Sequence, residues 1–129
     1  MKFIHPDELK KYWVWVKQGL LKVIEAGSDG WIPEDVYTSI KLNQATLHIA
    51  SEGEHFTGFV VLTVTEGYEG KKLFIWAAYH TAGNAVKKYL PELEQMAKKI
   101  GAKKIEFQSM RNWDKYYKRG MTTFSHEVF

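Results

Sequence analysis

The segment from residue 80 to residue 85 has the residue types of an anion-binding loop. It reads His80-Thr81-Ala82-Gly83-Asn84-Ala85 and lies between an apolar run and a stretch of helical periodicity. A glycine lets the backbone approach a phosphate closely, and the first turn of a helix offers amide groups without partners inside the helix. The segment therefore predicts a pyrophosphate site whose donors are the backbone amides of 82–85. The alternative is an ordinary turn built on Gly83 and Asn84.

Three further side chains are candidates for proton transfer. His80 ends the apolar run, where it would act as a base or contact a phosphate, or would simply cap the strand. Glu66 and Glu106 are candidate bases, but Glu106 alternates with Ile105 and Phe107 and is expected on the other face of a strand. The sequence does not choose a general base.

Several other chemistries have no support in the sequence. The chain has no cysteine, so it has neither disulfides nor a thiolate zinc site. No histidine or carboxylate spacing indicates a metal, and no nucleophile elbow is present. The segment 111–119 mixes basic and aromatic side chains, which could stack on nucleic acid, but Asp114 interrupts it and no known nucleic-acid module surrounds it.

The elements that would position these residues follow from the periodicity of apolar side chains. Helical spacing marks the first two, and both have a proline in the first turn. Strand spacing marks the next three, and short turns between them predict an antiparallel meander. In order, these elements are 6–25, 33–43, 45–51, 58–65 and 73–79. The strand 58–65 is nearly all apolar, which indicates a central strand covered on both faces.

The second half adds a crossover. A helix follows the loop 81–84 and ends at Ile100, and Pro91 within it must kink the helix or mark a late start. Then come a strand, a short helix and a last strand, at 104–109, 113–119 and 122–129. A strand-helix-strand step needs a right-handed crossover and a parallel pair. We therefore predict an α/β fold with a mixed sheet, helices on both faces, and a ligand at the carboxyl end near the loop 79–84.

Composition bounds the class of protein. With 129 residues, 45% of them hydrophobic, and a net charge of +3, the chain predicts one globular domain over 1–129. The mild positive charge permits an anionic partner without requiring one. No apolar run approaches the ~20 residues of a membrane span, and no signal-peptide core is present, so a cytoplasmic protein is expected. Trp15 lies off the apolar face of the first helix, and its exposure would hint at a partner surface.

The order of elements and several short phrases resemble the GNAT acetyltransferase superfamily over nearly the whole chain. The phrases 46–50 and 57–62 are similar to the first hairpin of that family, and the loop 80–85 is similar to its cofactor loop. The phrase Gly101-Ala102-Lys103-Lys104-Ile105 is similar to the junction after the cofactor helix. Asn112, followed by Tyr116-Tyr117-Lys118-Arg119-Gly120-Met121, is similar to the closing segment.

This resemblance implies an acetyl-CoA-dependent N-acetyltransferase acting on an unknown amine, without a metal. It places the pyrophosphate at the loop and the pantetheine arm beside 76–79, where the next strand splays away. The implied cofactor-binding residues are Ala78, Tyr79, His80, Ala82, Gly83, Asn84, Ala85 and Asn112. The implied catalytic residues are Tyr116, as the acid that protonates the leaving thiolate, its neighbour Tyr117, which a shift of one residue would exchange with it, and His80.

Departures from the family pattern keep two other interpretations open. His80 stands in place of the usual Arg or Gln, the loop has one glycine, and Pro91 interrupts the cofactor helix. The phrases 5–9, 31–37 and 44–50 also resemble small GNAT-like proteins of tailed phages and prophages. An inactive GNAT-fold phage protein, with a virion-assembly or host-interaction role and a phage or host protein partner, is therefore one alternative. Its place would be the host cytoplasm or the virion. A nucleic-acid-binding module is the other alternative. The final strand could pair across a homodimer.

Overall fold

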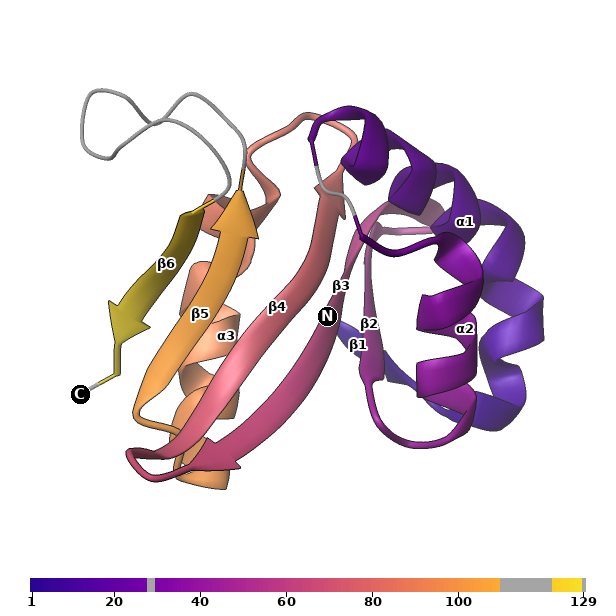
Figure 1. Ribbon diagram of the computed structural model, residues 1–129. Helices are drawn as coiled ribbons and strands as arrows, with labels where there is room; N and C mark the ends of the chain where they lie inside the picture. The colour runs from indigo at the N-terminus through magenta and orange to yellow at the C-terminus, as the bar shows by residue number, and fades with distance from the viewer. Residues whose placement is uncertain (28–29, 110–121, 129) are drawn as a thin grey trace.

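The protein is a six-stranded mixed sheet with helices on both faces, as a computed structural model describes it for residues 1–27, 30–109 and 122–128 (Figure 1). The strands follow one another in space in the order β1-β2-β3-β4-β5-β6. Their bounds are β1 Lys2–Ile4, β2 Thr46–Glu52, β3 His55–Gly67, β4 Gly70–His80, β5 Lys104–Ser109 and β6 Thr122–Glu127. The predicted α/β fold class is confirmed.

Every neighbouring pair of strands is antiparallel except β4 and β5, which are parallel. The helix α3 (Ala85–Ile100) makes the connection between these two strands. The predicted meander and the predicted parallel joint are therefore both confirmed. The predicted helix at 113–119 lies outside the described residues.

Two helices cover one face of the sheet, α1 (Leu9–Glu25) and α2 (Pro33–Lys41). Figure 1 shows them on the side opposite to α3. The apolar stripe predicted for α1 is confirmed, because Leu9, Val16 and Leu20 are fully buried. They pack with Phe59 and Val61 of β3. The next side chains along β3, Val60 and Leu62, instead pack with α3 residues such as Leu93. The strand β3 is thus central and covered on both faces, as its composition predicts.

Three details differ from the sequence-based prediction. The strand β1 was not predicted, because three residues at the edge of a sheet are too few to show an alternation. The segment 6–8 is a separate 3-10 helix, η1 (Pro6–Glu8), ahead of α1. Pro91 does not mark a late start, because α3 begins at Ala85 and runs through it. Pro91 is exposed, so its ring meets no packing obstacle on the solvent side.

Candidate functional site

The strands β4 and β5 run side by side for only four residue pairs and then separate. Pairing extends from Lys72 with Lys104 to Ile75 with Phe107, whereas β4 continues to His80. Figure 1 shows the gap widening toward the carboxyl ends of the two strands. The predicted splay of this pair is therefore present in the structure.

A β-bulge at Trp76 coincides with the point of separation. On the other side of β4, Leu62 pairs with Ile75 while Val61 pairs with Ala77, so Trp76 is the extra residue. The bulge changes which face the side chains use. Ile75 packs on the α3 side of the sheet, but Ala77, two residues later, packs on the α1 side. A regular strand would place both on one face.

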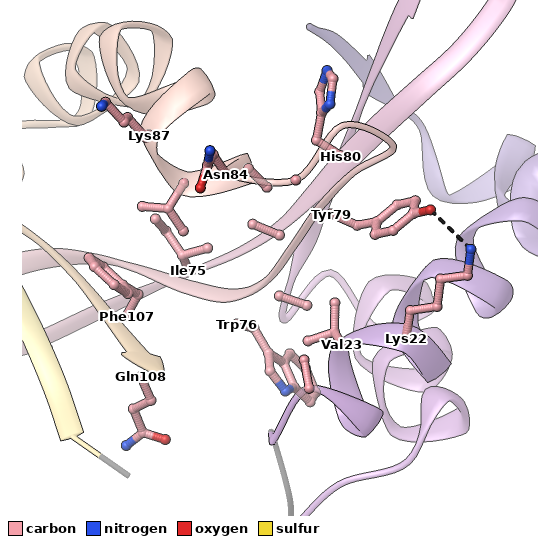
Figure 2. Close-up of a pocket in the computed structure, with 16 residues that line it drawn as sticks. Lys22, Val23, Ile75, Trp76, Tyr79, His80, Asn84, Lys87, Phe107 and Gln108 are labelled. Carbon is pink, nitrogen blue, oxygen red and sulfur yellow. Dashed lines mark hydrogen bonds between the residues drawn. The ribbon is translucent and has the colours of Figure 1, made fainter. Parts of the chain in front are cut away.

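A cavity of about 360 Å³ lies at this separation. Figure 2 shows its walls. They come from four parts of the fold: Lys22 and Val23 of α1 with Ala26 directly after it, the segment 75–80 of β4, the segment 83–87 at the start of α3, and Phe107 and Gln108 of β5. The ligand site predicted near the loop 79–84 thus coincides with a real cavity, whose volume suits a small molecule.

The loop before α3 uses two of its amides internally. The N–H of Ala82 donates to Nδ1 of His80 at 2.9 Å, and the N–H of Gly83 donates to the His80 carbonyl at 2.9 Å. Both amides were expected to bind phosphate. Because each already has an acceptor, the amides open to an anion are those that follow, from Asn84 onward.

The N-terminus of α3 is uncapped and positively biased. Asn84 adopts a left-handed conformation with φ of 54°, and its side chain makes no capping hydrogen bond. The first intrahelical bond runs from the N–H of Lys88 to the Asn84 carbonyl, so the amides of 85–87 have no partner within the helix. The first turn contains no acidic residue, whereas η1 and α2 both begin with acidic pairs. Lys87 adds an ammonium where the helix dipole is already positive.

His80 and Tyr79 point to opposite faces of the sheet. The ring of His80 lies 6.0 Å from the ring of Tyr89 on α3. Since its Nδ1 accepts the Ala82 amide, the neutral ring carries its proton on Nε2. His80 therefore belongs with the α3 side of the cavity. In Figure 2 its ring points away from Trp76 and Val23.

Tyr79 contacts α1 on the other face. Its ring lies 5.8 Å from Phe59, and its hydroxyl accepts a hydrogen bond from Nζ of Lys22 at 3.4 Å (Figure 2). The Lys22 ammonium also stands 5.7 Å from the centre of the Tyr79 ring. A side chain at Gly19 would overlap Phe59 and press on Tyr79, so this glycine makes room for both rings.

The backbone of β4 is fixed at this end by a buried tyrosine. The hydroxyl of Tyr89 donates to the Tyr79 carbonyl at 3.1 Å. Gly58 of β3 makes room for this bond, because an added Cβ would overlap both the Tyr79 carbonyl oxygen and the Tyr89 hydroxyl. Burial, and secondarily the charge of Glu92, raises the pKa of Tyr89 to about 12. Tyr89 thus remains a neutral donor.

Most of the residues assigned to the cofactor lie together. Ala78, Tyr79, His80, Gly83, Asn84 and Ala85 all line the cavity, and Ala82 does not. Asn112, Tyr116, Tyr117 and the basic segment 111–119 lie outside the described residues. Lys22, Val23 and Ala26 were not predicted, because nothing in a helix sequence indicates which sheet residue it will meet.

Neither candidate glutamate base lines the cavity. Glu106 makes an ion pair with Lys72 at 3.6 Å. Glu66 pairs in register with Lys71, at the end of the β3–β4 hairpin opposite to His80. In the described ranges, no three potential metal ligands among His, Asp and Glu gather at one place. None of the described helices is long and apolar enough to cross a membrane.

Comparison with solved structures gives the fold a context. An acetyltransferase of the GNAT family from Listeria monocytogenes superposes with a TM-score of 0.65 at 12% identity, covering 98% of this chain and 93% of that one. A predicted acetyltransferase from Clostridium acetobutylicum, solved with acetyl-CoA, superposes with a TM-score of 0.57 at 17% identity, covering 82% of this chain and 77% of that one.

An aminoglycoside acetyltransferase from an uncultured soil metagenomic sample, in complex with sisomicin, gives a TM-score of 0.63 at 16% identity, covering 89% of this chain and 79% of that one. No protein-family model and no curated protein matches the sequence. At identities this low, the structural similarity shows a shared fold and nothing about activity. Together with the parallel joint, the bulge at Trp76 and the cavity beside it, the comparison shows that this chain has the fold of the GNAT acetyltransferases.

Proposed function

We propose that the protein binds acetyl-CoA in the cavity between β4 and β5 and transfers its acetyl group to an amine. One observation carries this proposal: the cavity opens where β4 and β5 separate, directly at the uncapped N-terminus of α3. Proteins of this fold include one solved with acetyl-CoA. The cavity therefore suits a ligand with an anionic end and a thin, extended arm.

The start of α3 fits the diphosphate of CoA. The free amides of 85–87 and the dipole of a 16-residue helix favour an anion, and the Lys87 ammonium adds a full charge. An acidic residue in the first turn would oppose this binding, and the first turn has none. The internal hydrogen bonds of Ala82 and Gly83 hold the loop in the shape that presents these amides.

The edge of β4 fits the pantetheine arm. Beyond Ile75 the strand has no β5 partner, so its backbone polar groups can pair with the amides of an extended ligand, as a strand would. The bulge at Trp76 lies on this stretch, and bulges redirect backbone groups next to active sites. We assign the backbone around Trp76 and Ala77 to the thioester carbonyl.

The chemistry needs a neutral amine, a polarised carbonyl and a proton for the departing sulfur. When bound, acetyl-CoA supplies a thioester, which the amine cleaves to give an amide and the free thiol of CoA. A backbone donor at the bulge would stabilise the negative charge that develops on the carbonyl oxygen. We keep Tyr116 as the proposed acid for the thiolate and Tyr117 as its competitor, because a phenol is the right strength for that transfer.

The arrangement of the aromatic residues favours an active protein over an inactive descendant of the fold. In an inactive descendant, Trp76, Tyr79 or Tyr89 would be expected to fill the groove. Here Trp76 packs edge-on against Trp31 at 5.9 Å, Tyr79 packs on Phe59, and Tyr89 is buried under β4. All three leave the cavity open.

The test is calorimetric titration of acetyl-CoA into the protein and into two charge-reversal variants. Lys87→Glu places a carboxylate in the cavity wall and should weaken binding about tenfold or more, whereas Lys88→Glu, one residue along and outside the wall, should weaken it less. Gly83→Glu should also weaken binding. Absence of binding by the folded protein at millimolar acetyl-CoA would overturn the proposal. An equal loss in both lysine variants would exclude the α3 N-terminus as the phosphate site.

A further inference from the structure

Lys22 is an ammonium group at the cavity wall without a carboxylate partner among the described residues. Within residues 1–27, 30–109 and 122–128, its Nζ bonds to the Tyr79 hydroxyl and to no other side chain. By contrast, Lys17 of α1 pairs with Glu34 at 3.6 Å, and Lys72 of β4 pairs with Glu106. Glu25, one turn further along α1, makes no ion pair with Lys22. No described carboxylate thus neutralises the charge of Lys22, whose side chain is exposed at the cavity wall, where a ligand can reach it.

The Tyr79 hydroxyl supplies a second donor at the same place. Because Lys22 donates to the phenol oxygen, the phenol hydrogen remains free to donate elsewhere. The ring is held between Phe59 and α1, in the space that Gly19 leaves, so the hydroxyl has a fixed position. An ammonium and a hydroxyl that converge in this way form a binding site for a carboxylate.

A site for polycations needs negative charge, whereas the described charged residues of this cavity are positive. Its described walls contain Lys22 and Lys87 and no aspartate or glutamate. A polyamine or aminoglycoside would meet positive charge there without a carboxylate to pair with. Trp76 lines the cavity together with Val23 of α1, and Trp31 packs edge-on against Trp76 from behind, so this part of the wall suits an apolar or aromatic body.

We propose that Lys22 and Tyr79 bind the carboxylate of the acceptor, and that the acceptor is an amino acid or a similar amine bearing a carboxylate and an apolar body. This inference rests on the proposed acetyl transfer. Tyr79 lies three residues after the bulge at Trp76 on β4, and Lys22 reaches Tyr79 from α1. Lys22, Tyr79, Trp76 and Ala77 all line the same cavity, so an acceptor whose carboxylate binds the pair shares that cavity with the proposed position of the thioester.

The experiment measures acetyl transfer, as release of CoA thiol, to matched acceptors that differ in one carboxylate. The pairs are L-phenylalanine with phenethylamine and L-tryptophan with tryptamine, and spermidine serves as the polycation. The carboxylated member of each pair should have the higher kcat/KM, and spermidine should be the poorest acceptor. Lys22→Met should reduce that preference by about 10- to 100-fold, the range of a charge-assisted hydrogen bond.

The variants separate recognition from other roles. The loss in Lys22→Met should lie in the acceptor KM with kcat nearly unchanged, Lys22→Arg should restore the preference, and Tyr79→Phe should give a smaller loss. Lys10→Met, an exposed lysine of the same helix away from the cavity, is the matched control. Thermal unfolding checks that each variant is folded.

The outcomes distinguish this inference from the proposed function. Two outcomes overturn the inference alone while acetyl-CoA still binds. In one, the protein acetylates the amines without a carboxylate in preference to their carboxylated partners. In the other, it neither acetylates nor binds any carboxylated amine. Weaker acetyl-CoA binding in Lys22→Met also overturns it, because the ammonium would then serve a phosphate of the cofactor. A failure of acetyl-CoA to bind the wild-type protein overturns both.

Discussion

Gly19 sets how closely α1 approaches the sheet. It lies in the middle of a helix, where glycine costs roughly 1 kcal/mol relative to alanine. That cost is tolerated because a Cβ would overlap the Phe59 ring and stand 2.9 Å from Cδ1 of Tyr79. The absence of a side chain at Gly19 thus allows Tyr79 to reach Lys22.

We expect Gly19→Ala to destabilise the protein in spite of the better helix propensity. Overpacking a filled core costs about 1–3 kcal/mol, which exceeds the gain in propensity. Chemical denaturation would measure the free energy of unfolding, with Gln18→Ala, its exposed neighbour, as the control that should change little. If Gly19→Ala were as stable as the wild type, a Cβ at residue 19 would not clash with the Phe59 ring, and Gly19 would not set the distance between α1 and the sheet.

A second prediction at this scale concerns His48 on β2. Burial, and secondarily the positive charge of the N-terminus, lowers the pKa of His48 below its usual 6.5, and Glu92 partly offsets this. The unfolded chain therefore takes up a proton near pH 6.5 that the folded protein resists. The free energy of unfolding should be highest above pH 6.5 and should fall as the pH drops below it.

Urea unfolding at pH 7.5 and pH 5.5 tests this prediction. The free energy of unfolding should differ less between the two pH values in His48→Gln than in the wild type. The exposed His55 provides the control, and His55→Gln should keep the wild-type difference. An unchanged pH dependence in His48→Gln would remove His48 as its source.

At the scale of elements, α3 carries two features that do not favour a helix. Its first turn has lysines and no acidic residue, and Pro91 lies in its interior. The first feature is explained by the proposed phosphate site. Nothing in the structure explains the second: Pro91 is exposed, lines no part of the cavity, and leaves the Lys87 carbonyl without the amide that residue 91 would normally offer.

We therefore expect Pro91→Ala to stabilise the protein by about 1–3 kcal/mol, because the missing hydrogen bond is restored and the ring no longer crowds the preceding turn. The affinity for acetyl-CoA should not change. Denaturation and calorimetry on the same samples would measure both, with the exposed Gln95→Ala as control. A loss of acetyl-CoA affinity without a loss of stability would instead give Pro91 a part in shaping the site.

At the scale of the whole molecule, the cavity lies where two hydrophobic cores meet. One core joins α1 and α2 to the sheet, and the other joins α3 to it, with β3 and β4 contributing to both. A ligand that contacts α1, β4, β5 and α3 together binds only the complete fold. Its binding free energy should therefore add to the stability of the entire domain.

Acetyl-CoA at 100 times its dissociation constant should thus add about 2.7 kcal/mol to the free energy of unfolding. The measurement is the midpoint of thermal unfolding at rising acetyl-CoA concentration, which should increase by several degrees. Lys87→Glu should show a smaller increase at equal ligand concentration. A ligand that binds by calorimetry but leaves the midpoint unchanged would have to bind the unfolded chain as well.

Much of the architecture was predictable because it depends on local patterns. The spacing of apolar residues predicts which side of a helix is buried. Examples are Leu9, Val16 and Leu20 in α1, and Tyr89, Leu93 and Ala97 in α3. Short turns impose antiparallel neighbours, and one crossover imposes the parallel pair. Apart from β1 and η1, the order of the described elements, the mixed sheet and the place of the loop 80–85 after β4 were therefore determined by the sequence itself.

The site itself depended on tertiary structure. The segment Ile75-Trp76-Ala77-Ala78-Tyr79 is apolar throughout, so no alternation marks the bulge, and only the pairing with β3 locates it. The Ala82 and Gly83 amides were assigned to phosphate until the geometry placed His80 as their acceptor. Lys22 and Tyr79 are 57 residues apart and meet because Gly19 lets α1 lie against β4. Periodicity reports which face of an element is buried, whereas register and the distance between packed elements decide which side chains meet.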